Sequence, residues 1–581
     1  MRKVNYNKNT SQQTRKRLLI ISATFIVIFA LFNGLGEILS RNKPTEIVQE
    51  KPDDSVQETF SPSEVKPIIQ KTADDYNSDE TIVASSGTRY GVSTSNPIAS
   101  EVGMQVLENG GNAVDAAVAI SYALNVTDPQ NSGVGGGGGM LIYNQANGER
   151  IFYDYYISSG DVEPIANIGI PGFIKGLEVV TQDYGTMAYG DLIQYAIDLG
   201  EKGVEVTAGY AEVVNRYSYI TQVHPSFMID GRILQEGDLL IQPELMETFK
   251  AIRDYGSDVF YGGEHQISKN FMSLTGISPE ALANYTVHKY TPLETRYRGY
   301  DIIAAPAPFS GMSVLQNLIL EEQLDLPQHD LTNPEYNMMV KNILKFVGSE
   351  GRKLNTDPAF NTVDQVTALE PTGLLSRYNA SLSTEDTYEE PESESTTSFS
   401  VIDKDGMVVT ATNTISNYWG SYSISDGIIY NNAMKNFSST GVNAFDFNKR
   451  PKTGIAPLVI MNPQGHVESL GTNGGAKIPT YLAMHIINTK KFGMSVQQAN
   501  DMERFHYTKG LMHYENGAPF TVSGTDIVFE EPYTTLRSSD GWGIMNGLEF
   551  KANGEIRGHS DNRNYFEHGA IYSDGTQKYT N

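Results

Sequence analysis

The stretch TTSFSVIDKDGMVVTATNT, residues 396–414, decides the fold because it has the pattern of paired strands and follows directly after a polar segment. Apolar and polar side chains alternate on both sides of Asp405-Gly406. This alternation predicts two strands, and the Asp-Gly pair predicts the tight turn of a hairpin. The preceding residues 381–395, SLSTEDTYEEPESES, are acidic and poor in apolar side chains, which predicts an exposed, mobile loop. A mobile loop therefore delivers a Thr-Thr pair into a buried hairpin.

This arrangement makes Thr396 a candidate nucleophile created by chain cleavage. A threonine hydroxyl is a weak nucleophile and needs a base, and a freed α-amino group with a pKa near 8 can be that base within the same residue. The chain has no Cys, which excludes a cysteine nucleophile, disulfides, thiolate zinc sites and iron–sulfur clusters. On spacing alone, a surface loop that simply enters a strand is the more common explanation.

The residues upstream predict helices followed by a glycine-rich strand. Residues 96–111 have apolar side chains at helical spacing and end at a Gly pair, and residues 112–126 predict a helix buried on all sides with Asn112 as N-cap. Residues 187–203 and 242–256 predict further helices. Five glycines at 135–139 then lead into the strand MLIYN, so the backbone must pass close to other backbone there. The order of elements fits neither a Rossmann nor a P-loop fingerprint.

Composition excludes several partners. The 581 residues include 43 Lys and Arg against 69 Asp and Glu, a formal charge of −26, which argues against binding to nucleic acid. The ten His are scattered without a metal-ligand spacing, and His506 is expected to be structural, so no metal site is predicted. A basic run at 449–452, KRPK, is a candidate patch for an anionic partner or, alternatively, a solvated turn.

The N-terminal region predicts a membrane anchor. Residues 1–17 carry six Lys and Arg and no acid, and residues 18–36, LLIISATFIVIFALFNGLG, carry no charge. About 19 residues at 1.5 Å each approach the hydrocarbon thickness of a bilayer. The positive-inside rule then leaves a charge of −32 on the extracellular side. A cleaved signal peptide is the alternative. Residues 37–80 are polar and Pro-interrupted, which predicts a flexible stalk before a folded part that begins near residue 81.

From about residue 91 to the C-terminus, the chain resembles the γ-glutamyltransferases, which are N-terminal-nucleophile hydrolases that cut themselves before a Thr. The resemblance implies an α+β fold, a four-layer αββα sandwich, and the transmembrane helix expected from residues 18–36 precedes it. The resemblance further implies a large subunit at 81–395 and a small subunit at 396–581, with no cofactor. The matching pieces occur in the order of the family: SNPIASEVGMQVLENGGNAVDAAVAI, SGVGGGGGMLIY, GIPGF, APAPFSG, NTDPAF, STTSFSVIDKDG, NNAMKNFS, KRP, NGG, ERFHY and SDNR.

The resemblance also implies roles for single residues. Cleavage between Ser395 and Thr396 would free Thr396 as the nucleophile, and Thr414 would be the hydroxyl that holds it. Gly474 and Gly475 match the paired glycines whose N–H groups form the oxyanion hole, an arrangement that lowers the barrier by a few kcal/mol.

The substrate-binding positions depart from the general transferases. Those enzymes have an Arg, an Asn, a Gln and an Asp where this chain has Tyr156, Ser416, Ala433 and Asn436. A phenol cannot replace the bidentate carboxylate clamp of an Arg, so free glutathione is an unexpected substrate. Ser416, Asn436 and Thr453 agree instead with the capsule-depolymerase branch. In that branch an Arg near the C-terminus belongs to the site, and the candidates are Arg563 or, less strongly, Lys477; each is alternatively structural or solvated.

The expected function is an autoprocessing γ-glutamyl hydrolase and transpeptidase at the cell membrane, with an extracellular catalytic domain. The donor would be a γ-glutamyl polymer or peptide, and the acceptor water or an amine such as a cell-wall peptide. Two alternatives stay open, namely an acylase with a non-glutamyl substrate and a degenerate, membrane-tethered paralogue that binds polymer without catalysis.

Overall fold

The structure is a computed structural model that describes residues 90–222, 224–326, 333–383, 395–508, 510–515, 527–529, 542–551, 556–559, 561, 563, 570–572 and 579–580. All of them belong to one compact unit, residues 68–581. The predicted basic tip, anchor and stalk lie outside these residues. No helix within the described ranges is both long and apolar enough to cross a bilayer.

The predicted hairpin forms the centre of an eight-stranded sheet. Residues Thr397 and Ile402 of one strand pair with Asn413 and Val408 of the other, and Gly406 closes the turn with a φ of 85°. The glycine-rich strand lies next to this hairpin, with Gly137 opposite Thr414. The sheet order is β23 (Tyr579–Thr580), β22 (Ala570–Tyr572), β1 (Gly91–Ser93), β11 (Ser395–Ile402), β12 (Met407–Ser416), β2 (Gly137–Asn144), β3 (Arg150–Tyr155) and β8 (His288–Tyr290).

A six-stranded sheet packs face to face against the first one. Asn546 Nδ2 donates a hydrogen bond of 3.0 Å to the Ser398 carbonyl across the interface, and Gly471 lies where a Cβ would clash with the Ser398 side chain. Between the sheets, therefore, the backbones approach closely. The order is β21 (Ile556–His559), β20 (Met545–Phe550), β16 (Val467–Thr472), β15 (Leu458–Met461), β10 (Tyr300–Ala304) and β9 (Leu293–Tyr297).

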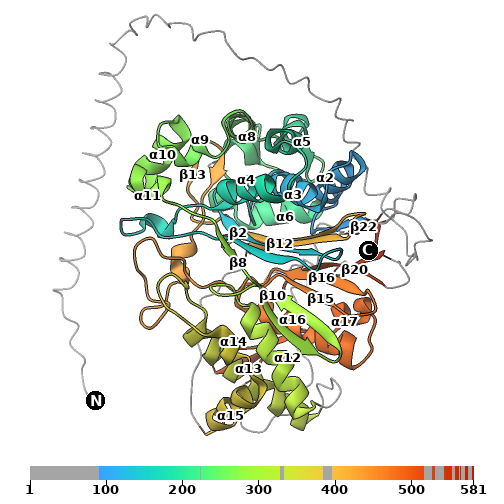
Figure 1. Ribbon diagram of the computed structural model, residues 1–581. Helices are drawn as coiled ribbons and strands as arrows, with labels where there is room; N and C mark the ends of the chain where they lie inside the picture. Colours follow the sequence, from blue (N-terminus) through green and yellow to red (C-terminus); the bar gives the residue numbers. More distant parts are fainter. Residues whose placement is uncertain are drawn as a thin grey trace, which may run out of the picture. The chain divides into compact units, whose positions relative to one another are not determined.

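Helices cover both outer faces, which completes the predicted four layers (Figure 1). The layer on the first sheet is built around α2 (Pro97–Glu108), α3 (Ala113–Thr127), α4 (Phe173–Tyr184), α5 (Tyr189–Lys202), α6 (Ala208–Arg216), α8 (Pro243–Tyr255) and α10 (Gln266–Thr275). The layer on the second sheet contains α12 (Gly311–Leu324), α13 (Pro334–Leu354), α14 (Gln365–Ala368), α15 (Pro371–Ser381), α16 (Ile478–Ile486) and α17 (Val496–Asp501).

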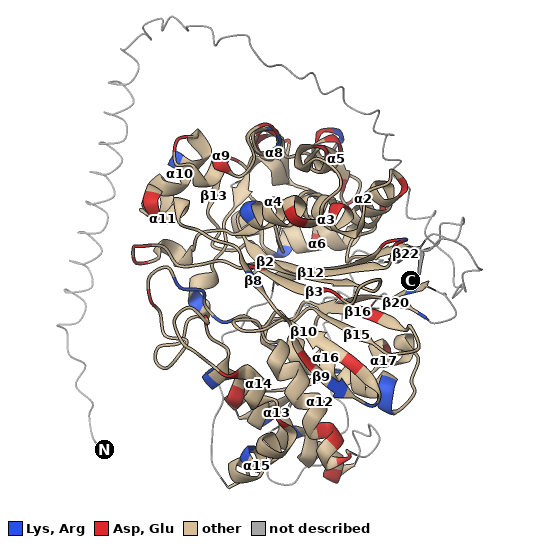
Figure 2. Ribbon diagram, in the orientation of Figure 1, with Lys and Arg blue, Asp and Glu red and all other residues tan. Residues whose placement is uncertain are grey.

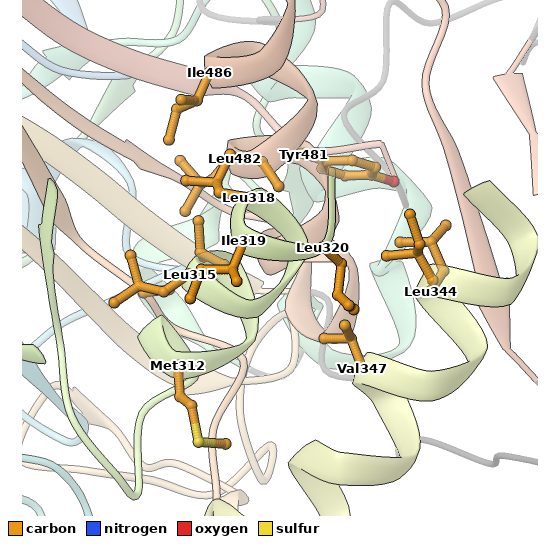
Figure 3. Packing of buried hydrophobic residues seen from close by; sticks show 14 of the residues in the cluster. Met312, Leu315, Leu318, Ile319, Leu320, Leu344, Val347, Tyr481, Leu482 and Ile486 are labelled. Carbon is orange, nitrogen blue, oxygen red and sulfur yellow. The ribbon is translucent and has the colours of Figure 1, made fainter. Parts of the chain in front are cut away.

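The largest apolar cluster joins the second helical layer to its sheet. Leu318 of α12, Leu344 of α13 and Leu482 of α16 meet in it, and all three are buried (Figure 3). Burying a Leu side chain contributes about 1.5–3 kcal/mol, so this cluster fixes the three helices against β10, β15 and β16. The beginnings of α12 and α16 are thereby held beside the ends of these strands.

The helices begin where the sequence predicts. Asn112 caps α3 with a full capping box, because its side chain accepts from the Asp115 amide and Asp115 accepts from the Asn112 amide. Every residue of α3 is buried, as expected for a helix that is apolar on all faces. Charged residues gather on the outer helices, whereas β2 and β12 carry none (Figure 2). The predicted helices at 96–111, 187–203 and 242–256 correspond to α2, α5 and α8.

Candidate active site

Thr396 lies at a β-bulge in the central hairpin. Ser395 pairs with Ser416 and Thr397 pairs with Asn413, so Thr396 faces two residues of β12 instead of one. Bulges redirect a side chain and occur often beside active sites. Thr396 is 2% exposed, so its hydroxyl sits in an interior where water does not compete for hydrogen bonds.

The bulge brings two threonine hydroxyls to the carbonyl group before Thr396. Thr396 Oγ1 and Thr414 Oγ1 are 3.3 Å apart, and each donates a hydrogen bond of 2.5 Å to the Ser395 carbonyl oxygen. The Ser416 amide in turn donates to Thr414 Oγ1 over 2.9 Å, which fixes that hydroxyl. The predicted nucleophile, its supporting hydroxyl and the predicted scissile carbonyl are thus in mutual contact.

A polar turn after α3 holds the residues on either side of Thr396. Ser395 Oγ donates to the Gln130 carbonyl over 2.9 Å, and Thr397 Oγ1 donates to Asp128 Oδ2 over 2.9 Å. Sequence reasoning missed this turn. The signal was present as DPQNSG at residues 128–133, a run of polar residues between a fully buried helix and the glycine-rich strand.

Four of the five predicted substrate-binding residues form one buried cluster. Asn436 Nδ2 donates to Tyr156 Oη over 3.2 Å and to Ser416 Oγ over 3.5 Å, and the Tyr156 phenol also hydrogen-bonds Thr453. Asn436 Oδ1 is buried and has no partner among the residues that the structure describes. Ala433 is buried in the same 3₁₀ turn as Asn436, residues Ala433–Asn436.

The electrostatics of this cluster keep the phenol neutral. Burial raises the pKa of Tyr156 above its ordinary value, while its hydrogen bonds with Thr453 and Asn436 oppose the shift. Below it, Asp154 accepts from the Tyr156 amide and pairs with Arg450 at 3.3 Å. Burial raises the pKa of Asp154 to about 6, although the Arg450 charge acts in the opposite direction. The backbone of Tyr156 is therefore held by the carboxylate of a buried ion pair.

Gly474 and Gly475 form the turn between β16 and α16. Their φ angles of 122° and 59° are in the region that favours glycine. Neither amide N–H donates a hydrogen bond to another residue in the described part of the chain. Gly454, next to Thr453, lies so close that its Cβ would meet the Gly475 carbonyl at 2.1 Å. The paired glycines thus border the same cluster, with donors available at the start of α16.

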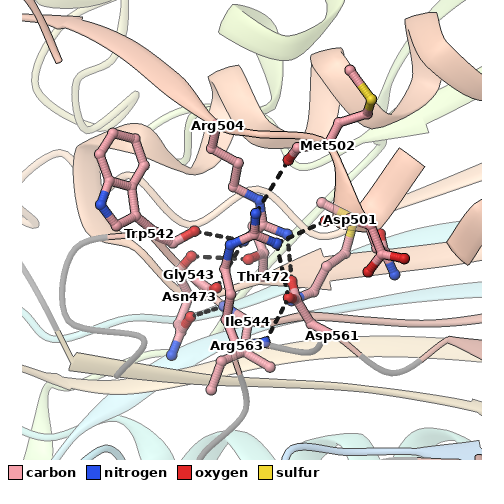
Figure 4. A network of polar contacts seen from close by, with 12 residues as sticks. Thr472, Asn473, Asp501, Met502, Arg504, Trp542, Gly543, Ile544, Asp561 and Arg563 are labelled. Atoms are coloured by element: carbon pink, nitrogen blue, oxygen red, sulfur yellow. Dashed lines mark hydrogen bonds and ion pairs between the residues drawn. The ribbon is translucent and has the colours of Figure 1, made fainter. Parts of the chain in front are cut away.

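A buried polar network supports this glycine turn from behind (Figure 4). Asn473 Oδ1 accepts from the Ile544 amide. Arg504 donates to the Trp542 carbonyl and, over 2.7 Å, to the Gly543 carbonyl, and it pairs with Asp561. Because Asp561 is 1% exposed, its charge depends on this pairing, and the adjacent guanidinium groups hold its pKa below the usual value despite burial.

Arg563, the fifth predicted binding residue, belongs to this network rather than to the cluster around Tyr156. Its guanidinium pairs with Glu515 and, at 3.1 Å, with Asp561, and it donates to two backbone carbonyls, of Asn500 and Met502. These contacts match the structural role left open as the alternative, and its part in substrate binding stays a prediction. The Lys477 ammonium lies 4.9 Å from the centre of the Trp542 ring.

The basic run at 449–452 is neither a solvated turn nor a continuous basic patch, which corrects both expectations. Lys449 and Arg450 are each 4% exposed. Lys449 Nζ donates to the Val442 and Ala444 carbonyls, and Arg450 pairs with Asp154. The sequence of this run shows the charges of Lys449 and Arg450 but not the buried groups that bind them.

A cleft opens beside the cluster. It extends from Asn436, Thr453 and Gly454 between α12, α13 and the start of α16, where His506 and Thr480 share a hydrogen bond of 2.9 Å. Lys452 also lines this cleft. The cleft can hold an extended substrate beside Asn436 and Thr453. The Thr396 hydroxyl and the glycine amides described above are the elements needed for acyl transfer through a covalent intermediate.

Comparison with known proteins agrees with this chemistry. The family model described as gamma-glutamyltranspeptidase matches residues 99–570. The Bacillus anthracis "Capsule biosynthesis protein CapD proenzyme" is 32% identical over 553 residues, covering 90% of this chain and 97% of that protein. The "Glutathione hydrolase proenzyme" of Bacillus subtilis (strain 168) is 31% identical over 487 residues, covering 74% and 83%.

A solved structure has the same fold. The crystal structure of a cephalosporin acylase from Bacillus halodurans superposes with a TM-score of 0.71 at 21% identity, over 85% of this chain and 97% of that one. At this identity the likeness concerns the fold alone. The family match and the two relatives carry the assignment: the chain belongs to the γ-glutamyltranspeptidase family and is an enzyme of the N-terminal-nucleophile hydrolase type.

Proposed function

We propose that the chain cuts itself between Ser395 and Thr396 and then acts as a γ-glutamyl hydrolase and transpeptidase. The contact of both threonine hydroxyls with the Ser395 carbonyl carries this proposal. Thr396 Oγ1 attacks the Ser395 carbonyl carbon, the peptide nitrogen takes a proton and leaves, and an ester forms. Water then hydrolyses the ester, which leaves a Ser395 carboxylate and a free Thr396 amino group.

The same oxygen serves each later turnover. The Thr396 amino group accepts the hydroxyl proton as Oγ1 attacks a γ-glutamyl carbonyl, and the amine of the substrate leaves. The Gly474 and Gly475 amides face the developing oxyanion, a contribution of about 2.7–4 kcal/mol for each donor in comparable sites. Attack by water or by a second amine on the acyl-enzyme then releases the glutamyl group.

The substrate that fits the cluster is an internal γ-glutamyl linkage, as in poly-γ-glutamate. The buried Asn436 Oδ1 has no described partner and accepts an N–H. A neutral amide suits the amide N–H inside a polymer, whereas the ammonium of a terminal glutamyl unit requires a carboxylate at that position. The relative named for capsule biosynthesis shares most of this chain's length and agrees with a polymer substrate.

The test is product analysis by mass spectrometry with poly-γ-glutamate and with glutathione. We expect shortened polymer or polymer–amine conjugates, and turnover of glutathione at least tenfold slower in kcat/KM. Asn436→Asp should shift this ratio toward glutathione, because it adds a partner for the ammonium. Glutathione consumption that equals or exceeds polymer cleavage in the unaltered enzyme would contradict the polymer assignment.

An acylase is the second candidate, favoured by the uncharged phenol of Tyr156 where a carboxylate clamp is expected. The "Acylase ACY 1 proenzyme" of Pseudomonas sp. (strain SE83) is 28% identical over 516 residues, which covers 81% of this chain. Preferential turnover of glutaryl or aliphatic amides over γ-glutamyl amides would establish this alternative.

We propose further that residues 18–36 anchor the enzyme in the cell membrane with the catalytic domain outside. The support is the uncharged run and the six basic residues before it. A polymer or wall substrate is reached directly from that side of the membrane.

A further inference from the structure

We propose that Lys452 binds the α-carboxylate of a glutamyl unit and thereby determines specificity. This inference rests on the proposed function, because it names the group that recognises the substrate's charge at the same site. No role for Lys452 follows from the family resemblance, which assigned only its neighbour Thr453.

The position of Lys452 is the first argument. It lines the cleft together with Asn436 and Thr453, and it precedes the residue whose side chain hydrogen-bonds Tyr156. Among the described residues that line the cleft, Lys452 is the sole Lys or Arg, and none is Asp or Glu. In a chain with a formal charge of −26, this cleft offers a local cation without a carboxylate beside it.

The Lys452 charge is not neutralised by another group in the described part of the chain. The adjacent cations already have partners within the fold, since Lys449 Nζ donates to backbone carbonyls and Arg450 pairs with Asp154. The Lys452 ammonium makes no hydrogen bond or ion pair with any residue in the described ranges, and the side chain is half-buried. Partly excluding water around an ammonium strengthens its attraction for a carboxylate.

The backbone of Lys452 is held firmly enough to aim the side chain. Its amide donates to Asn443 Oδ1 over 2.8 Å, and Asn443 Nδ2 donates to the Asn436 carbonyl over 2.9 Å. The following residue is fixed as well, because the Thr453 amide donates to the Pro308 carbonyl over 3.0 Å and its carbonyl accepts from Ser310. Asn443 thus couples Lys452 to Asn436.

Together the two side chains match the two polar groups of one glutamyl unit. The Lys452 ammonium meets the α-carboxylate, and Asn436 Oδ1 accepts the α-N–H of the same or the neighbouring unit. In the general transferases an Arg at the position of Tyr156 supplies the positive charge. Here the charge comes from the Lys452 side chain in the cleft, on a different element from Tyr156.

The test compares Lys452→Met and Lys452→Arg in the self-cleaved full chain, with Lys404→Met as control. Lys404 is exposed on the β11–β12 turn and does not belong to the described residues that line the cleft. The substrates are an Nα-acyl γ-glutamyl anilide, which carries an amide N–H like an internal unit of the polymer, and its α-carboxamide analogue, which lacks only the carboxylate charge. For K452M we expect kcat/KM to fall about tenfold to a hundredfold further on the charged substrate than on the analogue, mainly through KM. K452R should restore most of the difference, and Lys404→Met should show none.

An equal effect of K452M on both substrates would overturn the inference while leaving the proposed function intact. If the unaltered enzyme turns over neither substrate, the proposed function fails, and Lys452 is judged by binding instead. Calorimetry with a short poly-γ-glutamate fragment then decides. Equal affinity of the unaltered protein and K452M for the fragment, or no detectable binding to either, contradicts a carboxylate site. A binding loss of at least tenfold in K452M supports it.

Discussion

At the scale of single residues, the site depends on two hydroxyls and one carbonyl that the β-bulge brings together. Thr396 and Thr414 are eighteen positions apart in the sequence, and the hairpin turn at Gly406 makes them neighbours. The alternating pattern around Asp405-Gly406 predicted the hairpin, and the family resemblance singled out Thr414 as the partner of Thr396. The pattern could not reveal the bulge, because the alternation of apolar and polar side chains does not show where one strand has an extra residue opposite its partner.

Thr414 is expected to accelerate self-cleavage because it donates to the Ser395 carbonyl oxygen, where negative charge develops. Thr414→Val keeps the shape and removes this donor, so cleavage should slow by a factor on the order of 10². Thr414→Ser keeps the donor and should cleave near the normal rate. The measurement is a time course of subunit formation on denaturing gels, and cleavage of Thr414→Val at the unaltered rate would refute this role.

The residues that sequence reasoning placed least well are the buried cations. Arg450 and Arg563 pair with carboxylates that lie hundreds or tens of positions away, Asp154 and Glu515. Such pairs depend on the tertiary packing of distant segments. A single sequence therefore shows their charge but not their burial.

The Asp154–Arg450 pair makes stability depend on pH. Because burial raises the pKa of Asp154 to about 6, its protonation stabilises the folded state at low pH, and this contribution is lost as the pH rises through 6. Relative to Asp154→Asn, the unaltered protein should lose on the order of 2 kcal/mol of unfolding free energy between pH 4 and pH 7.5. Urea denaturation at both pH values measures this difference. A difference that increases with pH would show that the carboxyl is stabilised in its charged form.

At the scale of elements, the catalytic groups sit at the ends of strands that two sheets hold in register. Gly137 and Gly138 of β2 pair with Thr414 and Asn413 of β12, and a Cβ on Gly138 would meet the Thr412 carbonyl at 2.4 Å. Four of the five glycines, 135–138, are thus required by close backbone packing beside the nucleophile, which the sequence indicated, whereas a Cβ on Gly139 would meet the rings of Phe152 and Phe309. The second sheet contributes the glycine turn between β16 and α16.

Arg504 connects this turn to the C-terminal strands, so its loss should affect both stability and activity. Arg504→Met leaves the buried Asp561 with a weaker set of partners, at a cost of about 3–5 kcal/mol, and frees the Gly543 carbonyl behind Asn473. We expect a lower unfolding free energy by denaturant titration and reduced kcat. Arg232→Met is the matched control, because Arg232 pairs with Asp238 at an exposed position and should change neither quantity appreciably. Equal effects of the two substitutions would contradict the supporting role.

At the scale of the whole molecule, the sequence indicated one four-layer domain instead of the several that 581 residues would allow, and the structure has those layers. The ordered motifs carried that prediction, since no single one of them is specific. The cleft between α12, α13 and α16 could not be predicted from the sequence, because residues from six separate stretches of the chain line it.

The membrane anchor is also a property of the whole molecule. Deleting residues 1–36 should move the enzyme from the membrane fraction to the soluble fraction without loss of self-cleavage, because the catalytic domain carries its own core. Fractionation followed by immunoblotting measures this. A deleted form that stays with the membrane would show that another segment holds it there.

The most direct test of the central claim is the intact mass of the purified full chain and of its Thr396→Ala variant. We predict that the unaltered chain separates into two polypeptides cut between residues 395 and 396, the smaller one beginning with a free Thr396 amino group, while Thr396→Ala remains a single chain. A chain that stays uncut, or a variant that is cut at the same bond and at the same rate, would contradict it.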